Sequence, residues 1–157
     1  MNLLFLDVDG VLTCSRRAHE SGLSLGRKQL QLLNKLVTTS RCGIVVTSTW
    51  RLWPGSMDIL ASAFKEHGIP QWLGTTPDLP SLHRGEEILE WLRSNLVTSS
   101  VAVGIDDCRD IAIPGDHGLP VRYKPIATDF DTGLTPGVVK EALAWFAGAE
   151  KKGWWEP

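Results

Sequence analysis

The chain has 157 residues, 43% of them hydrophobic and 22% charged, and its formal net charge is −2. This length is enough for one core and too short for a sizeable second domain, so we predict a single domain over residues 1–157. The near-neutral charge excludes a global attraction to nucleic acid or to acidic membranes, and any recognition of anions must therefore be local.

The first predicted element is a buried strand over residues 1–6, because its large apolar residues leave no polar face for solvent. Asp7 and Asp9 follow at its end, and Gly10 fits a turn that lets both carboxylates converge on one cation or phosphate. Ligands bind outside the carboxyl ends of parallel strands, so this pair is placed for chemistry. The alternative, a calcium loop, needs further acidic ligands that residues 13–17 do not supply.

The middle of the chain alternates between helices and strands. We predict, in order, a loop over 13–22, a helix over 25–40 capped by Ser24, a strand over 43–46, and a helix over 54–67. Residues 71–73 either add a short strand or cover the core, and 75–82 form a loop. A helix beginning near 83–86 follows. Its buried stripe holds Ile88, Trp91 and Leu92, and its solvent face holds Glu86, Glu87, Glu90 and Arg93.

A second carboxylate cluster follows the strand predicted at 101–105, where Asp106 and Asp107 adjoin and Asp110 comes shortly after. We then predict a loop over 108–120, a short edge strand over 121–123, a turn over 128–134, a helix beginning with Thr135 and Pro136, and a frayed tail over 151–157. This alternation predicts an α/β fold with a mostly parallel central sheet and helices on both faces.

The location of the protein is predicted from what the sequence lacks. The apolar start is cut at Asp7 and has no basic leader, so it is not a signal peptide, and no stretch reaches the length of a membrane span. Cys14, Cys42 and Cys108 are odd in number and far apart, which favours reduced thiols. We expect a cytoplasmic protein without a membrane partner.

The segment Phe5–Leu12 resembles the first motif of the haloacid dehalogenase (HAD) superfamily of aspartate-nucleophile phosphohydrolases. The resemblance implies a Rossmann-like HAD fold in which Asp7 forms an aspartyl-phosphate and Asp9 protonates the leaving group and then activates water. It also makes Thr47 the hydroxyl that binds a phosphoryl oxygen, with Thr49 as the alternative in register. A cap or strand-end turn is the other interpretation of Thr47.

The third and fourth HAD motifs are matched less uniformly. The third is usually a lysine, and Arg84 is the candidate replacement, because arginine can bind phosphate through two nitrogens; a surface role is the alternative. Asp106 and Asp107 match the fourth motif, which implies that Mg²⁺ is bound together with Asp7 and Asp9. Family habit favours Asp106 as the ligand, with Asp110 behind it.

Several short strings narrow the resemblance to the HAD domain found in Swiss Army Knife RNA repair proteins, which is related in motif style to the phosphatase half of polynucleotide kinase-phosphatases. These strings are Thr49–Arg51, Arg84–Leu92, Ile105–Asp107 and Thr132–Thr135. The intervals between motifs leave little or no room for a cap domain. The resemblance thus implies an open site suited to RNA or DNA ends.

Aromatic and basic residues near the motifs fit such a substrate. Trp50 and Trp53 could stack on bases, and Arg51 could contact substrate, as could Arg16, Arg17 and His19 on the loop after Asp9. Core packing is the alternative for both tryptophans. Two other functions stay open: a small-molecule phosphatase (nucleotidase or sugar phosphatase), and a catalytically silent binding module, against which Asp7, Asp9 and Asp106 argue.

Overall fold

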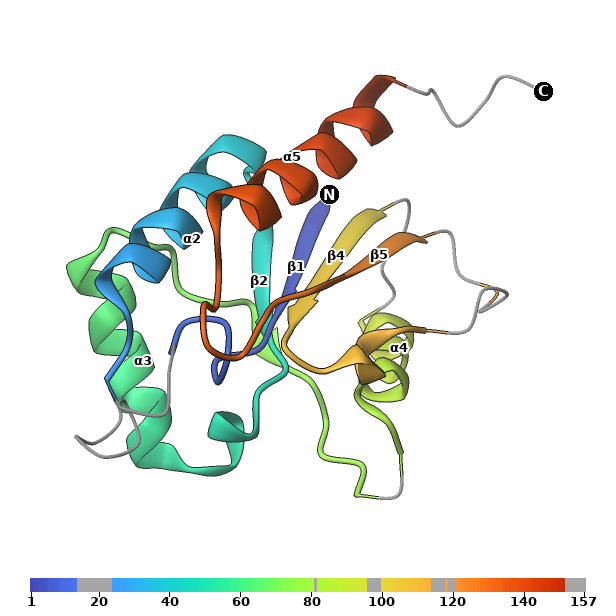
Figure 1. Cartoon of the computed structure of the whole chain (residues 1–157). Coiled ribbons are helices and arrows are strands. Elements are labelled where there is room, and N and C mark those ends of the chain that lie inside the picture. The colour runs from blue at the N-terminus through green and yellow to red at the C-terminus, as the bar shows by residue number, and fades with distance from the viewer. Residues whose placement is uncertain (14–23, 81, 96–99, 114–117, 119–120, 152–157) are drawn as a thin grey trace.

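The computed structural model describes residues 1–13, 24–80, 82–95, 100–113, 118 and 121–151 of the chain. These residues contain five parallel strands, which form one sheet in the order β3-β2-β1-β4-β5 (Figure 1). The strands are β1 (Asn2–Leu6), β2 (Gly43–Val46), β3 (Gly74–Thr75), β4 (Ser100–Asp106) and β5 (Val121–Ala127). The architecture is the predicted α/β, Rossmann-like one, with a sheet that is parallel throughout.

The central strand is β1, which pairs with β2 on one side and with β4 on the other. Its apolar residues are buried on both faces, as expected of a strand in the middle of a parallel sheet. The prediction for β1 is confirmed, and β2 has the predicted bounds. The apolar run at the start of the chain therefore forms the centre of the core.

The two edge strands differ from the sequence expectation. β3 comprises Gly74 and Thr75 and not residues 71–73. Trp72 instead packs edge-on against Phe64, so this stretch covers the core, as the alternative held. β5 is seven residues long and not three. It contains Pro125, which an edge strand tolerates because one side of β5 pairs with no other strand of the described residues.

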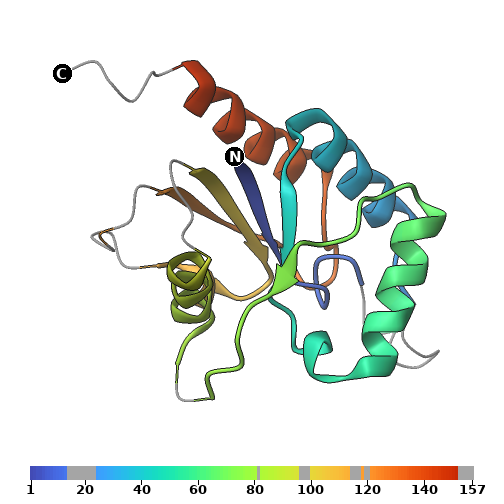
Figure 2. The ribbon, with the colours of Figure 1, turned by 180° about the vertical axis from the view of Figure 1, so that it is seen from behind.

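Within the described residues, four α-helices flank the sheet: α2 (Arg27–Ser40), α3 (Pro54–Glu66), α4 (Arg84–Ser94) and α5 (Pro136–Lys151). Two 3₁₀-helices, η1 (Thr49–Leu52) and η2 (Arg109–Ile111), follow β2 and β4. α2, α3 and α5 pack on one apolar cluster and α4 on another, so helices cover both faces. Figures 1 and 2 show α2 and α5 side by side, with α4 apart from them.

Helix starts were predicted with mixed success. Thr135 caps α5, since its Oγ1 accepts a hydrogen bond from Val138 N. Ser24 does not cap α2; the capping residue is Gly26, whose N–H donates to the Leu12 carbonyl at 2.7 Å. This bond holds the chain extended before the helix, so α2 begins two residues later than predicted.

The chain order of the strands creates a switch point in the sheet. From β1 the chain first builds β2 and β3 on one side and then crosses to build β4 and β5 on the other. In open α/β sheets the ligand crevice lies at such a point, outside the carboxyl ends of the strands. Here that point lies between the ends of β1 and β4.

No inserted cap domain interrupts the part of the chain that the structure describes. Among the same residues, no helix is long and apolar enough to cross a membrane. The predicted loop over 13–22 and the tail beyond Lys151 fall almost entirely outside the described residues.

Candidate active site

Three polar residues form a row across the carboxyl edge of the sheet. Asp7 N donates to the Ile105 carbonyl at 3.0 Å, and Thr47 N donates to the Leu6 carbonyl at 2.9 Å, so the ladder continues one residue beyond β1 and β2. Leu6 pairs with Val46 on one side and with Ile105 on the other, and this register places Asp7 between Thr47 and Asp106. All three are buried, and strand alternation turns their side chains toward α4.

Arg84, the first residue of α4, joins two members of this row. Its Nη1 lies 2.8 Å from Asp7 Oδ1 and 2.8 Å from Asp106 Oδ2. From the sequence we expected Arg84 to bind phosphate through two nitrogens. In the structure one of its nitrogens, Nη1, contacts the carboxylates of Asp7 and Asp106. This contact places Arg84 inside the site and away from a surface role.

The start of α4 is held in place by close packing. A Cβ on Gly85 would lie 2.1 Å from the Ala112 carbonyl oxygen, so only glycine lets the helix approach this segment. The N–H of His83 donates to Glu86 Oε2 at 3.0 Å and closes the first turn. The position of Arg84 is therefore set by backbone contacts on both sides.

The cluster carries more negative than positive charge. Burial raises the pKa of Asp7, although the nearby Arg84 and a hydrogen bond from the Ser48 hydroxyl act in the opposite direction. Burial together with the charge of Asp7 raises the pKa of Asp106 to about 7. One arginine does not balance two buried carboxylates, so a further positive charge would stabilise their ionised forms.

A divalent cation would balance the excess negative charge of these carboxylates. Oxygen atoms of Asp7, Asp106 and Asp107 all lie within 4.8 Å of one another, and carboxylates are the ligands that Mg²⁺ prefers. A Cβ on Gly10 would lie 2.6 Å from Asp107 Cβ, and Gly10 has a φ of +72°, so the turn after Asp9 needs glycine to make room for this carboxylate. The residues present thus suit the ion that the sequence predicted.

Asp106 and Asp107 are held differently. The two oxygens of Asp106 accept from Arg84 Nη1 and from Cys108 N, each at 2.8 Å. Asp107 is half-buried and lies against Gly10. Asp110 does not belong to the carboxylate trio, which consists of Asp7, Asp106 and Asp107. It is exposed, and its Oδ2 lies 3.7 Å from His83 Nδ1.

The side chain of Asp9 points elsewhere than the trio. Its Oδ2 accepts from Trp50 Nε1 at 3.0 Å, and its Oδ1 lies 3.4 Å from Thr13 Oγ1. Trp50 is 3% exposed, so its ring has no face open to a base and the core-packing alternative holds for it. Trp53, by contrast, is 65% exposed at the start of α3.

Arg51 is also not available to substrate as the sequence suggested. Its side chain is 5% exposed, and its nitrogens donate to three backbone carbonyls and to Glu87 Oε2 at 2.9 Å. Glu87, which we expected to face water, is buried as the partner of Arg51 and also accepts from Leu79 N. The pair is internal because η1 turns Arg51 under α4.

The hydroxyl of Thr47 has no hydrogen-bond partner among the described residues, although it is buried. Thr76 shares this feature, but Thr47 alone lies beside Asp7 in the row. Thr49, the alternative in register, is exposed and begins η1. The structure therefore favours Thr47 over Thr49 as the hydroxyl next to the carboxylates.

Sequence reasoning missed Ser48, Thr13 and Glu87. Ser48 bonds Asp7 and also caps η1 by accepting from Trp50 N at 3.3 Å. Its position inside a polar run after a buried strand was the available signal. Arg16, Arg17 and His19, which we expected near substrate, lie outside the described residues.

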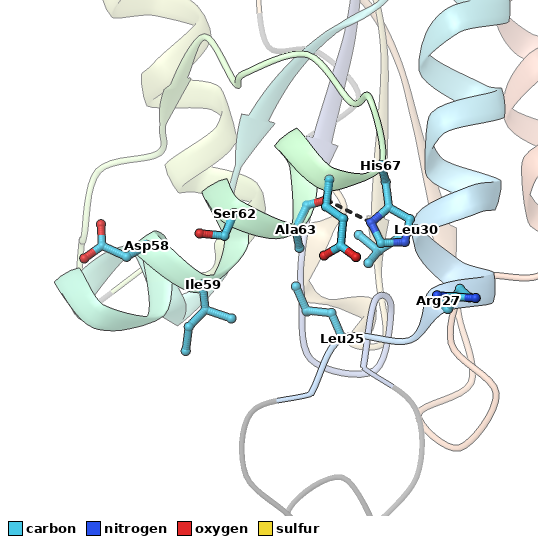
Figure 3. A pocket seen from close by; sticks show the side chains of 9 residues that line it. Leu25, Arg27, Leu30, Asp58, Ile59, Ser62, Ala63 and His67 are labelled. Atoms are coloured by element: carbon cyan, nitrogen blue, oxygen red, sulfur yellow. Dashed lines mark hydrogen bonds between the residues drawn. The ribbon is translucent and has the colours of Figure 1, made fainter.

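A separate cavity of about 520 Å³ lies between α2 and α3 (Figure 3). Its lining mixes apolar side chains such as Leu30 and Ile59 with Arg27, Asp58 and His67. His67 Nδ1 lies 3.0 Å from the Ala63 carbonyl, so the ring is already engaged. Asp7, Thr47 and Asp106 are not among the residues that line it, so this cavity is separate from the candidate active site.

Comparison with known proteins gives three findings. The family described as the HAD domain in Swiss Army Knife RNA repair proteins matches residues 3–139. No curated protein matches the chain. A solved structure from Legionella pneumophila, provisionally assigned as a HAD superfamily (subfamily III A) hydrolase, is 16% identical, with a TM-score of 0.42 over 96% of this chain and 84% of that chain.

Proposed function

Because the chain belongs to the family of HAD domains found in Swiss Army Knife RNA repair proteins, we propose that it is a Mg²⁺-dependent phosphatase acting on the phosphate ends of nucleic acids. The observation that carries this proposal is Arg84 Nη1, which lies 2.8 Å from both Asp7 and Asp106 at the switch point of the sheet. A buried carboxylate oriented by an arginine beside two further carboxylates suits a nucleophile and a cation, and a binding module needs neither.

In the first half of the reaction, a carboxylate oxygen of Asp7 attacks the phosphorus atom of the substrate. A bond forms between that oxygen and phosphorus, and the bond from phosphorus to the leaving oxygen breaks. Asp9 gives its proton to the leaving oxygen, so that an alcohol departs. The hydrogen bonds from Arg84 and Ser48 hold Asp7 in one orientation for this attack.

In the second half, Asp9 accepts a proton from water as the water oxygen attacks phosphorus. The bond between phosphorus and Asp7 breaks, inorganic phosphate leaves, and both carboxylates return to their starting states. The hydroxyl of Thr47, which has no partner among the described residues, is suited to donate to a phosphoryl oxygen in both steps.

Mg²⁺ would be held by the carboxylates of Asp7 and Asp107, with Asp106 as the alternative to Asp107, and would supply positive charge next to the phosphoryl oxygens. The resemblance to HAD proteins implies the backbone carbonyl of Asp9 as a further ligand. Asp106 is the less suited of the pair because both its oxygens already accept hydrogen bonds. This assignment departs from family habit, which favours the first aspartate.

A nucleic-acid end as substrate is supported by the surroundings of Asp9. η1 carries Trp50, which contacts Asp9, and three residues later Trp53 is exposed at the start of α3. Leu52, between them, is 44% exposed. An exposed indole three residues after the one that contacts Asp9 can stack on an unpaired base, and a phosphorylated sugar has no base to stack.

The test compares a 3′-phosphorylated oligonucleotide with the matching mononucleotide. We expect the oligonucleotide to give the higher kcat/KM, because contacts remote from the phosphate contribute binding energy, and the advantage to shrink with added salt. Trp53→Ala should reduce the advantage, whereas Leu73→Ala, which also truncates an exposed apolar side chain, should not.

Equal rates for both substrates without salt dependence would make the protein a small-molecule phosphatase. An absence of turnover on every phosphomonoester, with Mg²⁺ present, would make it a silent binding module.

A further inference from the structure

The side chain of Asp9 is hydrogen-bonded by Trp50, a residue far from it in the sequence. Trp50 Nε1 donates to Asp9 Oδ2 at 3.0 Å, although the two residues are 41 positions apart. The other oxygen, Oδ1, lies 3.4 Å from Thr13 Oγ1, which in turn accepts from Gly10 N at 3.2 Å. The carboxylate is thus held by two donors of unequal strength, the indole being the closer.

Trp50 itself is fixed by η1. Its backbone N–H donates to Ser48 Oγ, and its carbonyl accepts from Trp53 N at 3.0 Å. The next residue, Arg51, is locked by its buried ion pair with Glu87. The indole ring is 3% exposed and packs with the core residues around β1 and β2. A rigid element therefore presents the N–H to Asp9.

We propose that Trp50 is a positioning residue that orients Asp9 for proton transfer, an inference that rests on the proposed function of Asp9 as the acid and base. The indole N–H is a donor only, so it binds Oδ2 as an acceptor. A proton carried by Asp9 is then favoured on Oδ1. The proton given to the leaving oxygen is accordingly the one on Oδ1, and Oδ1 receives the proton from water in the second step.

This role differs from that of an ordinary buried tryptophan. Packing would be preserved by phenylalanine, which fills most of the same space without the N–H. An oriented acid matters most when the leaving oxygen is strongly basic, because only such a group needs its proton in the transition state. The effect of losing the N–H should therefore depend on the leaving group, which an effect on folding would not.

The contact is tested first without any turnover. The chain has seven tryptophans, so a ¹⁵N–¹H spectrum can show seven indole signals, and Trp50→Phe identifies the signal of Trp50 by its loss. We expect Asp9→Ala to shift that signal upfield and to leave the other six in place. An unmoved Trp50 signal in Asp9→Ala would show that the hydrogen bond does not exist in solution and would overturn the proposal.

The role is tested next by kinetics on two substrates. Trp50→Phe should lower kcat for an alkyl phosphate by about tenfold or more and for an aryl phosphate by less than about threefold, with KM little changed. Trp145→Phe is the matched control. It removes the same group from a hydrogen bond, Trp145 Nε1 to the Ala102 carbonyl at 3.2 Å, at the other end of β4, and should leave both rates near wild type.

The double variant completes the test. In an Asp9→Asn background, Trp50→Phe should cause no further loss, since the residue it positions is already disabled. Equal losses on both substrates, or additive losses in the double variant, would assign Trp50 to packing alone. Absence of turnover by the wild-type protein on every phosphomonoester would instead overturn the proposed function and this role with it, whatever the indole spectrum shows.

Discussion

α4 takes part in two arginine–carboxylate clusters, through Glu87 in the first and through Arg84, one turn earlier, in the second. The two clusters differ in their balance of charge. Around Arg51, one guanidinium faces one buried carboxylate, Glu87, and also donates to three backbone carbonyls. Around Arg84, one guanidinium faces two carboxylates, Asp7 and Asp106, with a third nearby. The first cluster is neutral and closed, whereas the second keeps a surplus of negative charge.

The difference separates a structural ion pair from one that is suited to the proposed reaction. A buried pair whose charges are matched, and whose guanidinium already donates to four oxygens, has little left to offer a ligand. A cluster with an unmatched carboxylate attracts a cation, and it raises the pKa of Asp106 because burial and Asp7 both disfavour its charge. Composition alone would not distinguish the clusters, since both consist of arginine and acidic residues.

The largest expected effect comes from removing the carboxylate at the centre of the second cluster. Asp7→Asn should lower kcat by at least about 10⁴-fold, because an amide is a poor nucleophile. The melting temperature should not fall, since the substitution also removes repulsion between Asp7 and Asp106. Phosphate release and thermal unfolding measure the two, and Asp110→Asn, which changes an exposed carboxylate outside the trio, is the control. Activity above about 1% of wild type would exclude Asp7 as nucleophile.

Breaking the first cluster should damage stability more than chemistry. Arg51→Met leaves Glu87 buried without its partner and should lower the free energy of unfolding by about 3–5 kcal/mol. Arg51→Met combined with Glu87→Met should recover most of this loss, because no unpaired charge remains. Urea unfolding measures both variants. If the double variant is as unstable as the single one, the ion pair is not what the single substitution disrupts.

The next largest effect is expected from replacing Arg84, whose Nη1 contacts both Asp7 and Asp106. Arg84→Ala should reduce kcat by about 10²- to 10³-fold, since it removes the donor that orients Asp7. Arg84→Lys should retain activity to within about tenfold of wild type. One nitrogen contacts both carboxylates, which an ammonium group can also do, although the guanidinium fork is lost. Steady-state rates compare the variants. Equal rates for the two substitutions, both near wild type, would show that the second cluster does not depend on this charge.

The smallest expected effect concerns the third carboxylate. Asp107→Asn should raise the Mg²⁺ concentration needed for half-maximal activity by at least about tenfold, and a chelator should stop the wild-type reaction. A titration of rate against Mg²⁺ measures this shift, again with Asp110→Asn as the unaffected control. An unchanged Mg²⁺ requirement in Asp107→Asn would move the ligand to Asp106.

Much of the candidate site could be predicted because its signals are local. The apolar run before Asp7 predicted β1, and the run before Asp106 predicted β4, since a buried parallel strand needs apolar residues on both faces. Acidic residues directly after such runs lie at the carboxyl edge in any parallel sheet. This rule places Asp7, Asp106 and Asp107 at the same edge of the sheet, and the resemblance to HAD proteins implied that they share one cation; the structure brings them together.

What depended on register or on distant partners could not be predicted. Glu87 was assigned to the solvent face by helical periodicity, but η1 brings Arg51 beneath it. Trp50 was assigned to the substrate by its neighbourhood, but its indole reaches Asp9 across 41 positions. Local pattern states only that a residue is polar or large, whereas the topology of the sheet decides which distant group it meets. A buried polar group must find such a partner, so its role is settled only when the strands and helices are in place.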